Sequence, residues 1–156
     1  MTFDNVKKMI ELSEEKKSLL NEILEITKFQ QDLIKNEQME ELNQSLLEKE
    51  KLIDKINIID RDFLKFYDQV KVQEHIDSLD KIDIQKYSNI KALKEIVSEI
   101  NTILNNISII DKNNTIKMKS NVDKIKSDLK QVKEAKRAYK GYNYENVESI
   151  LMDEKK

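Results

Sequence analysis

The sequence predicts an all-α protein, an antiparallel bundle of four long helices with coiled-coil-like packing and a C-terminal tail. Apolar residues recur at three- and four-residue intervals over most of the 156 residues, which is the spacing of amphipathic helices. The chain has one Gly and no Pro, and the turns of a sheet protein depend on those residues. Only 38% of the residues are hydrophobic, which favours a thin apolar seam along long helices over a thick core.

Two helices are expected in the first half, at about residues 3–35 and 37–71. The first apolar stripe is Val6, Met9, Leu12, Leu19, Ile23, Ile26 and Leu33. The second stripe is Met39, Leu42, Leu46, Ile53, Ile56, Phe63, Tyr67 and Val70, with Lys49 and Asp60 as polar members. The pattern lapses at residues 35–38. A short turn there makes the two helices antiparallel.

Two more helices are expected at about residues 86–110 and 113–140, after an irregular connector. The third stripe is Ile90, Leu93, Val97, Ile100, Leu104 and Ile107. The fourth stripe, which is out of phase with the third, is Met118, Val122, Ile125, Leu129, Val132, Lys136 and Tyr139. Residues 111–114 are therefore either a turn or a stutter within one very long helix. Four helices of matched length, each about 45 Å, favour the turn and a closed bundle.

The domain organisation follows from these stripes. Residues 1–140 form the predicted helical bundle domain, and Gly141 stands where a helix stop signal belongs. Residues 141–156 form a tail that is either a short amphipathic helix or disordered. The first residues lack the apolar segment of a signal peptide, and no run approaches the about 20 apolar residues that span a bilayer. We therefore predict a cytoplasmic protein without membrane insertion.

The residue patterns of zinc sites, di-iron sites and Cys–His nucleophile sites are missing. The chain has no Cys and one His, His75, so the usual zinc ligand sets cannot be assembled. A di-iron bundle needs Glu three residues before His, and Val72 is at that position. There is no Gly-rich phosphate loop. We predict no enzymatic activity, no catalytic residue, no cofactor and no metal.

Positive charge is concentrated in residues 112–140, which carry ten basic and three acidic residues. Lysines recur there every seven residues beside the fourth apolar stripe, at Lys112, Lys119, Lys126, Lys133 and Lys140. They either face acidic neighbours within the bundle or form a basic docking face, Lys119, Lys126, Lys133 and Lys140, for an acidic protein. Nucleic acid is a poor partner, because the chain has a net charge of −2 and no aromatic residues interleave the lysines.

The C-terminal segment combines tyrosines with aliphatic residues. Tyrosine is enriched at interfaces, so the segment either folds back on the bundle or binds a partner. The candidate partner-binding residues are Val132, Tyr139, Tyr142, Tyr144, Val147, Ile150 and Leu151.

Taken together, the chain resembles the FlgN family of flagellar type III export chaperones. The resemblance covers nearly the whole chain. It rests on the order and spacing of these pieces: Leu19–Leu24, Leu33–Leu42, Lys49–Ile53, Arg61, Ile110–Asn114, Tyr139–Gly141, Ser149 and Asp153. It implies a chaperone that binds the C-terminal helices of hook–filament junction (hook-associated) proteins, prevents their early assembly and delivers them to the flagellar export apparatus.

The same resemblance implies that the C-terminal part of the chain contacts the exported protein, which we call the client. Two alternatives remain. One is a FliT-type chaperone of the filament cap protein, and the other is a structural coiled-coil subunit that is not a chaperone. The sequence leaves open whether the free protein is a monomer or a weak dimer.

Overall fold

The computed structural model describes the backbone of residues 1–154 and the side chains of residues 1–140. Three α-helices, α1 (Thr2–Lys35), α2 (Met39–Glu74) and α3 (Ile90–Glu154), and one 3₁₀ helix, η1 (Leu79–Lys81), follow one another, and the described residues contain no strand. The predicted all-helical class is confirmed. The chain divides into two compact units, Met1–Asn114 and Thr115–Lys156, and the division falls within α3.

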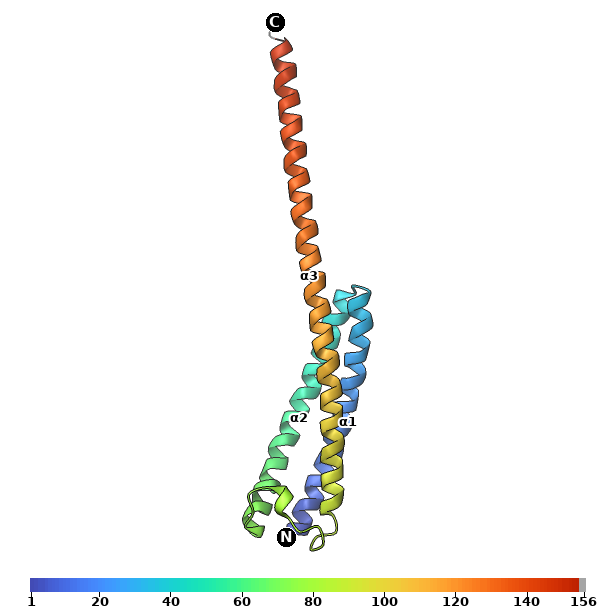
Figure 1. Cartoon of the computed structure of the whole chain (residues 1–156), viewed down its shortest axis with the longest axis vertical. Helices are drawn as coiled ribbons and strands as arrows, with labels where there is room; N and C mark the ends of the chain where they lie inside the picture. Colours follow the sequence, from blue (N-terminus) through green and yellow to red (C-terminus); the bar gives the residue numbers. More distant parts are fainter. Residues whose placement is uncertain (155–156) are drawn as a thin grey trace. The chain divides into compact units, whose positions relative to one another are not determined.

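The unit Met1–Asn114 packs α1, α2 and the first part of α3 along one apolar seam. Figure 1 shows α1 and α2 running side by side in opposite directions, with a short turn between them. The core combines residues of all three helices with Ile82 of the connector: Val6, Met9, Leu20, Ile23, Ile56, Val70, Ile82, Ile90, Leu93, Ile96, Ile100, Ile103 and Ile107. The thin seam expected from the low apolar content is therefore present in this unit.

The turn between α1 and α2 closes through backbone hydrogen bonds. Glu37 N–H donates to the Ile34 carbonyl at 3.2 Å, and Gln38 N–H donates to the Leu33 carbonyl at 2.9 Å. This pair of bonds is the Schellman motif, in which the residue after the C-cap adopts the left-handed conformation. Glu37 has φ 56° and fills that position without being a glycine.

The connector between α2 and α3 is held to the start of α1 by a polar cluster around Glu74. Thr2 Oγ1 donates to Glu74 Oε1 at 2.9 Å, and the hydroxyl of Tyr87 donates to the same oxygen. Lys86 Nζ lies 3.3 Å from Glu74 Oε2. The hydrogen bonds from Tyr87 and Thr2, with the Lys86 ammonium, hold the pKa of Glu74 below its usual value.

The expected four-helix bundle is corrected to three α-helices, because α3 continues through residues 111–114 without a turn. Asp and Asn in a helix interior cost at most about 0.7 kcal/mol each relative to Ala, and both keep their backbone N–H. The helix therefore needs only partners for the polar side chains that interrupt the apolar stripe. Those partners are present.

The partners of Asp111 and Asn114 belong to one cluster of polar residues, which we call the polar layer. It consists of Thr27, Gln30, Ser45, Lys49, Asp111 and Asn114. Lys49 Nζ donates to Gln30 Oε1 at 3.1 Å and to Asp111 Oδ1 at 2.9 Å. Gln30 Nε2 donates to Ser45 Oγ at 3.0 Å. Asn114 is buried, and its Nδ2 donates to the Thr27 carbonyl at 3.2 Å. The polar layer thus accepts Asp111 and Asn114 at seam positions.

With Asp111 and Asn114 counted as seam residues, the apolar pattern of α3 is continuous. It proceeds from Asn114 to Met118 and then to Val122 in two successive four-residue steps, which is a stutter. Of the two alternatives left open for residues 111–114, the stutter is the one found.

Candidate functional site

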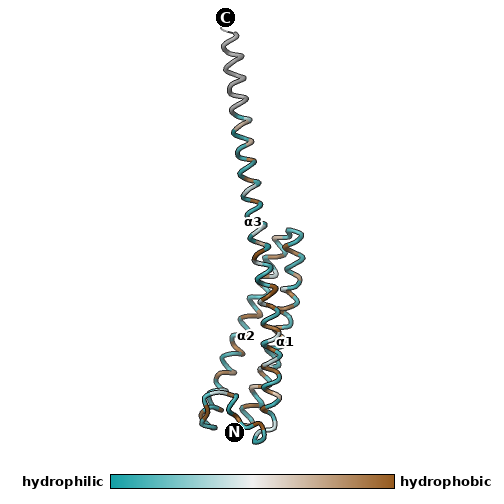
Figure 2. The backbone as a smooth tube through the Cα atoms, viewed as in Figure 1, coloured by the Kyte–Doolittle hydropathy of each residue, from teal (hydrophilic) through white to brown (hydrophobic). Residues whose placement is uncertain are grey.

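An apolar stripe with coiled-coil spacing lies along the described part of α3 after residue 114. We define the apolar stripe as Met118, Val122, Ile125, Leu129, Val132 and Tyr139, with Lys136 at the seam position between the last two. Met118 is partly buried, and the other five side chains are 45–67% exposed. In Figure 2 apolar and polar residues alternate along this part of α3. Contiguous exposed apolar residues of this kind mark interaction surfaces.

Lysines follow one flank of the apolar stripe. We define the lysine column as Lys119, Lys126, Lys133 and Lys140, all of which are exposed. The stripe residues Met118, Ile125, Val132 and Tyr139 take heptad position d, so the lysines that follow them take position e, next to the seam. Residues 112–140 carry a net charge of +7, while residues 1–111 carry −7. The site is therefore an apolar helix face with one basic edge.

The chemistry of this surface is that of helix recognition. An amphipathic partner helix can bury its apolar face on the stripe through coiled-coil contacts, and flanking charges select the partner. Among the described residues, no group of three or more His, Cys, Asp or Glu side chains could hold a metal ion. None of the described helical segments is long and apolar enough to span a membrane.

A second candidate is an apolar groove of about 280 Å³ within the unit Met1–Asn114. Phe63, Tyr67 and Leu79, which line it, already pack against the core cluster. Its polar lining includes the ion pair of Lys16 Nζ and Asp60 Oδ1, 2.7 Å apart. The groove is therefore a gap along the seam of this unit, suited to an apolar side chain.

The predicted site residues fall into two groups. Val132, Tyr139 and the four lysines Lys119, Lys126, Lys133 and Lys140 are exposed on α3. The side chains of the others lie outside the described residues, although their backbone belongs to α3: Tyr142, Tyr144, Val147, Ile150 and Leu151. The side chains of the predicted tail, residues 141–156, also lie outside the described residues.

Sequence reasoning missed three stripe residues, Val122, Ile125 and Leu129, as candidates for the site. Their heptad spacing is visible in the sequence, and it predicts the core of a closed four-helix bundle. In the structure all three side chains are exposed. The signal was therefore present in the sequence, and the missing information was whether another helix covers it.

Similarity to known proteins indicates the family to which the chain belongs. Neither the curated proteins nor the solved structures gave a match. A family model described as FlgN protein matches residues 1–146, which is nearly the whole chain. The resemblance found in the sequence is thereby confirmed. The chain belongs to the FlgN family, a family of flagellar export chaperones.

Proposed function

We propose that the chain is an export chaperone of the hook–filament junction proteins. It binds their C-terminal helical segments in the cytoplasm, prevents premature assembly and delivers them to the flagellar export apparatus. The observation that supports this proposal is the exposed apolar stripe on α3. A client segment that assembles through a helix has an apolar face of its own, and a chaperone helix can cover that face.

Family membership and the stripe support different parts of the proposal. The family suggests a chaperone of flagellar export. The stripe suggests how the chaperone holds a client, because Val122, Ile125, Leu129 and Val132 each keep about half of their surface exposed. Ordering a client segment on this face consumes part of the binding free energy, which keeps the complex reversible. Delivery for export requires that reversibility.

The test is complex formation with defined client segments. The full chain is mixed with the C-terminal segment of a hook–filament junction protein or of a filament cap protein, and size-exclusion chromatography with light scattering gives the mass. A one-to-one complex with the junction segment is expected. A complex with the cap segment alone would favour the FliT-type alternative. A constitutive homodimer that binds neither segment would favour the structural subunit.

Variants on α3 locate the contact. Ile125→Ser with Leu129→Ser removes two exposed stripe side chains, and we expect at least about tenfold weaker binding, which corresponds to about 1.4 kcal/mol. The matched control is Ile109→Ser with Ile116→Ser. These two isoleucines of the same helix are at least as exposed as Ile125 and Leu129, and Ile116 lies nine residues before Ile125, on the opposite face. Equal effects of the two variants would refute the stripe as the contact.

A deletion tests the predicted residues that follow the stripe. Removing residues 142–156 deletes Tyr142, Tyr144, Val147, Ile150 and Leu151 while leaving the described side chains in place. We expect weaker binding of the junction segment and an unchanged unfolding transition. Unchanged binding would exclude these five residues from the site.

A further inference from the structure

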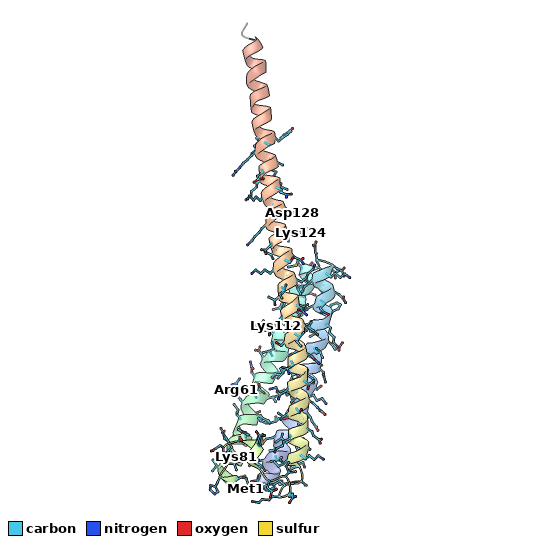
Figure 3. The ribbon with its side chains drawn as sticks, in the orientation of Figure 1. Met1, Arg61, Lys81, Lys112, Lys124 and Asp128 are labelled. Carbon is cyan, nitrogen blue, oxygen red and sulfur yellow. The ribbon has the colours of Figure 1, made fainter. Side chains whose placement is uncertain are left out.

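The two flanks of the apolar stripe differ in charge. On the heptad positions next to the seam, one flank carries the lysine column. The equivalent positions on the other flank are Asn121, Asp128 and Ala135, so that flank holds one carboxylate and no cation. Figure 3 labels Asp128, and also Lys124, a lysine that lies outside the column. The basic edge is thus confined to one side of the stripe.

This asymmetry makes a second copy of α3 a poor occupant of the stripe. In an antiparallel pair the lysine columns of the two copies would face each other, and like charges at those positions oppose pairing. In a parallel pair each column would face the other flank, where Asp128 is the one acid. Neither arrangement provides a carboxylate for each lysine.

We infer that the occupant of the stripe is an amphipathic client helix with a row of Asp or Glu residues, spaced every seven residues, along the edge that faces the lysine column. The inference rests on the proposed function, since it describes the helix that the stripe binds. The column repeats with the coiled-coil heptad, so a client acid at the matching heptad position meets each lysine in turn. The opposite edge of the client helix needs no particular charge.

The alternative to this positional recognition is a general attraction between residues 112–140, with their net charge of +7, and any acidic molecule. The two differ in how they respond to the position of a charge. Positional recognition depends on the lysine column alone. General attraction depends on the total charge and is indifferent to which lysine is changed.

The experiment uses the full chain and two synthetic helical peptides. The peptides share the same apolar heptad residues and differ only along one edge, which carries Glu in one and Lys in the other. Fluorescence anisotropy measures binding at low and at moderate ionic strength. We expect the Glu peptide to bind at least about tenfold more tightly at low salt, with the preference shrinking as salt is added.

Two charge-reversal variants decide between the interpretations. Lys126→Glu with Lys133→Glu changes the column, and we expect about tenfold weaker binding of the Glu peptide and a gain for the Lys peptide. Lys117→Glu with Lys124→Glu changes the net charge equally at exposed positions away from the stripe, and we expect binding close to that of the wild type. Circular dichroism checks that both variants keep their helix content.

Each outcome bears on the inference separately from the proposed function. Equal weakening by the two variants, no preference between the peptides, or no binding of either peptide would overturn the inference. Binding of the junction segment would leave the proposed function standing in all of these cases. Conversely, a column-dependent preference for the Glu peptide without binding of the junction segment would support the inference and refute the proposed client.

Discussion

Replacing Asp111 by alanine is the sharpest test of the polar layer that carries α3 through residues 111–114. The Lys49 ammonium donates to Asp111 Oδ1 at 2.9 Å and to Gln30 Oε1 at 3.1 Å. The side chain of Lys49 is 10% exposed, and that of Asp111 is 45% exposed. Asp111→Ala therefore leaves a buried cation without its carboxylate.

The expected loss of stability follows from the exposed fractions of the Lys49 and Asp111 side chains. A hydrogen bond that involves a charged group contributes about 1.5–3 kcal/mol when it is buried. Asp111 is half exposed, so water screens part of the interaction, and the lower end of the range applies. We expect Asp111→Ala to lower the free energy of unfolding by about 1.5 kcal/mol.

The assay is urea unfolding at neutral pH, followed by far-UV circular dichroism. Glu99→Ala is the control, because it breaks a pair of similar length, Lys17 Nζ to Glu99 Oε2 at 2.6 Å, whose side chains are 36% and 54% exposed. Its expected cost is below about 0.5 kcal/mol. Lys49→Met combined with Asp111→Ala should cost less than the two single changes added together, because it removes the unpaired charge. Equal costs for Asp111→Ala and Glu99→Ala would refute this account of the polar layer.

Three further predictions concern the rest of the described chain. Glu37→Gly relieves a left-handed residue at φ 56° and should raise the free energy of unfolding by about 1 kcal/mol in urea titrations, whereas Asn36→Gly, at φ −91°, should not. Glu74→Gln removes a carboxylate whose pKa is held below 4.5, so thermal unfolding should show the wild-type advantage above about pH 4.5 and its loss as pH falls through the lowered pKa. Leu93→Ala, at a fully buried position, should cost about 3 kcal/mol in urea titrations, whereas Leu129→Ala on the exposed stripe should change stability by less than about 0.5 kcal/mol.

The helical class could be predicted from the sequence because the spacing of apolar residues is a local property. The path of α3 through residues 111–114 could not, because its partners are distant in sequence. Asp111 is bonded to Lys49, 62 residues away, and Asn114 to Thr27, 87 residues away. A polar residue in an apolar stripe indicates a turn when considered alone and a polar layer once such partners are known.

The candidate site could likewise be predicted only in part. The tyrosines and aliphatic residues of the C-terminal segment predicted Val132 and Tyr139 as site residues. The heptad spacing placed Ile125 and Leu129 on the same helix face, but spacing does not reveal whether a helix face is covered. That depends on the number of helices, and the number of helices depended on residues 111–114. The sequence allows two interpretations of residues 111–114, and the choice between them decides both the expected number of helices and whether the stripe residues belong to the core.

The energetics of the stripe argue that it does not act alone. Burying the exposed half of its apolar side chains contributes on the order of 6 kcal/mol, and the client face buried against them contributes about as much again. Association costs at least about 4 kcal/mol in lost translational and rotational freedom, and about 0.5–1.5 kcal/mol more for each side chain that it immobilises. A micromolar complex needs about 8 kcal/mol net. Exposed ion pairs along the lysine column add only a few tenths of a kcal/mol each. Further apolar contacts are the expected source of the remaining free energy, and for that reason we propose that the site continues beyond Tyr139 to Leu151.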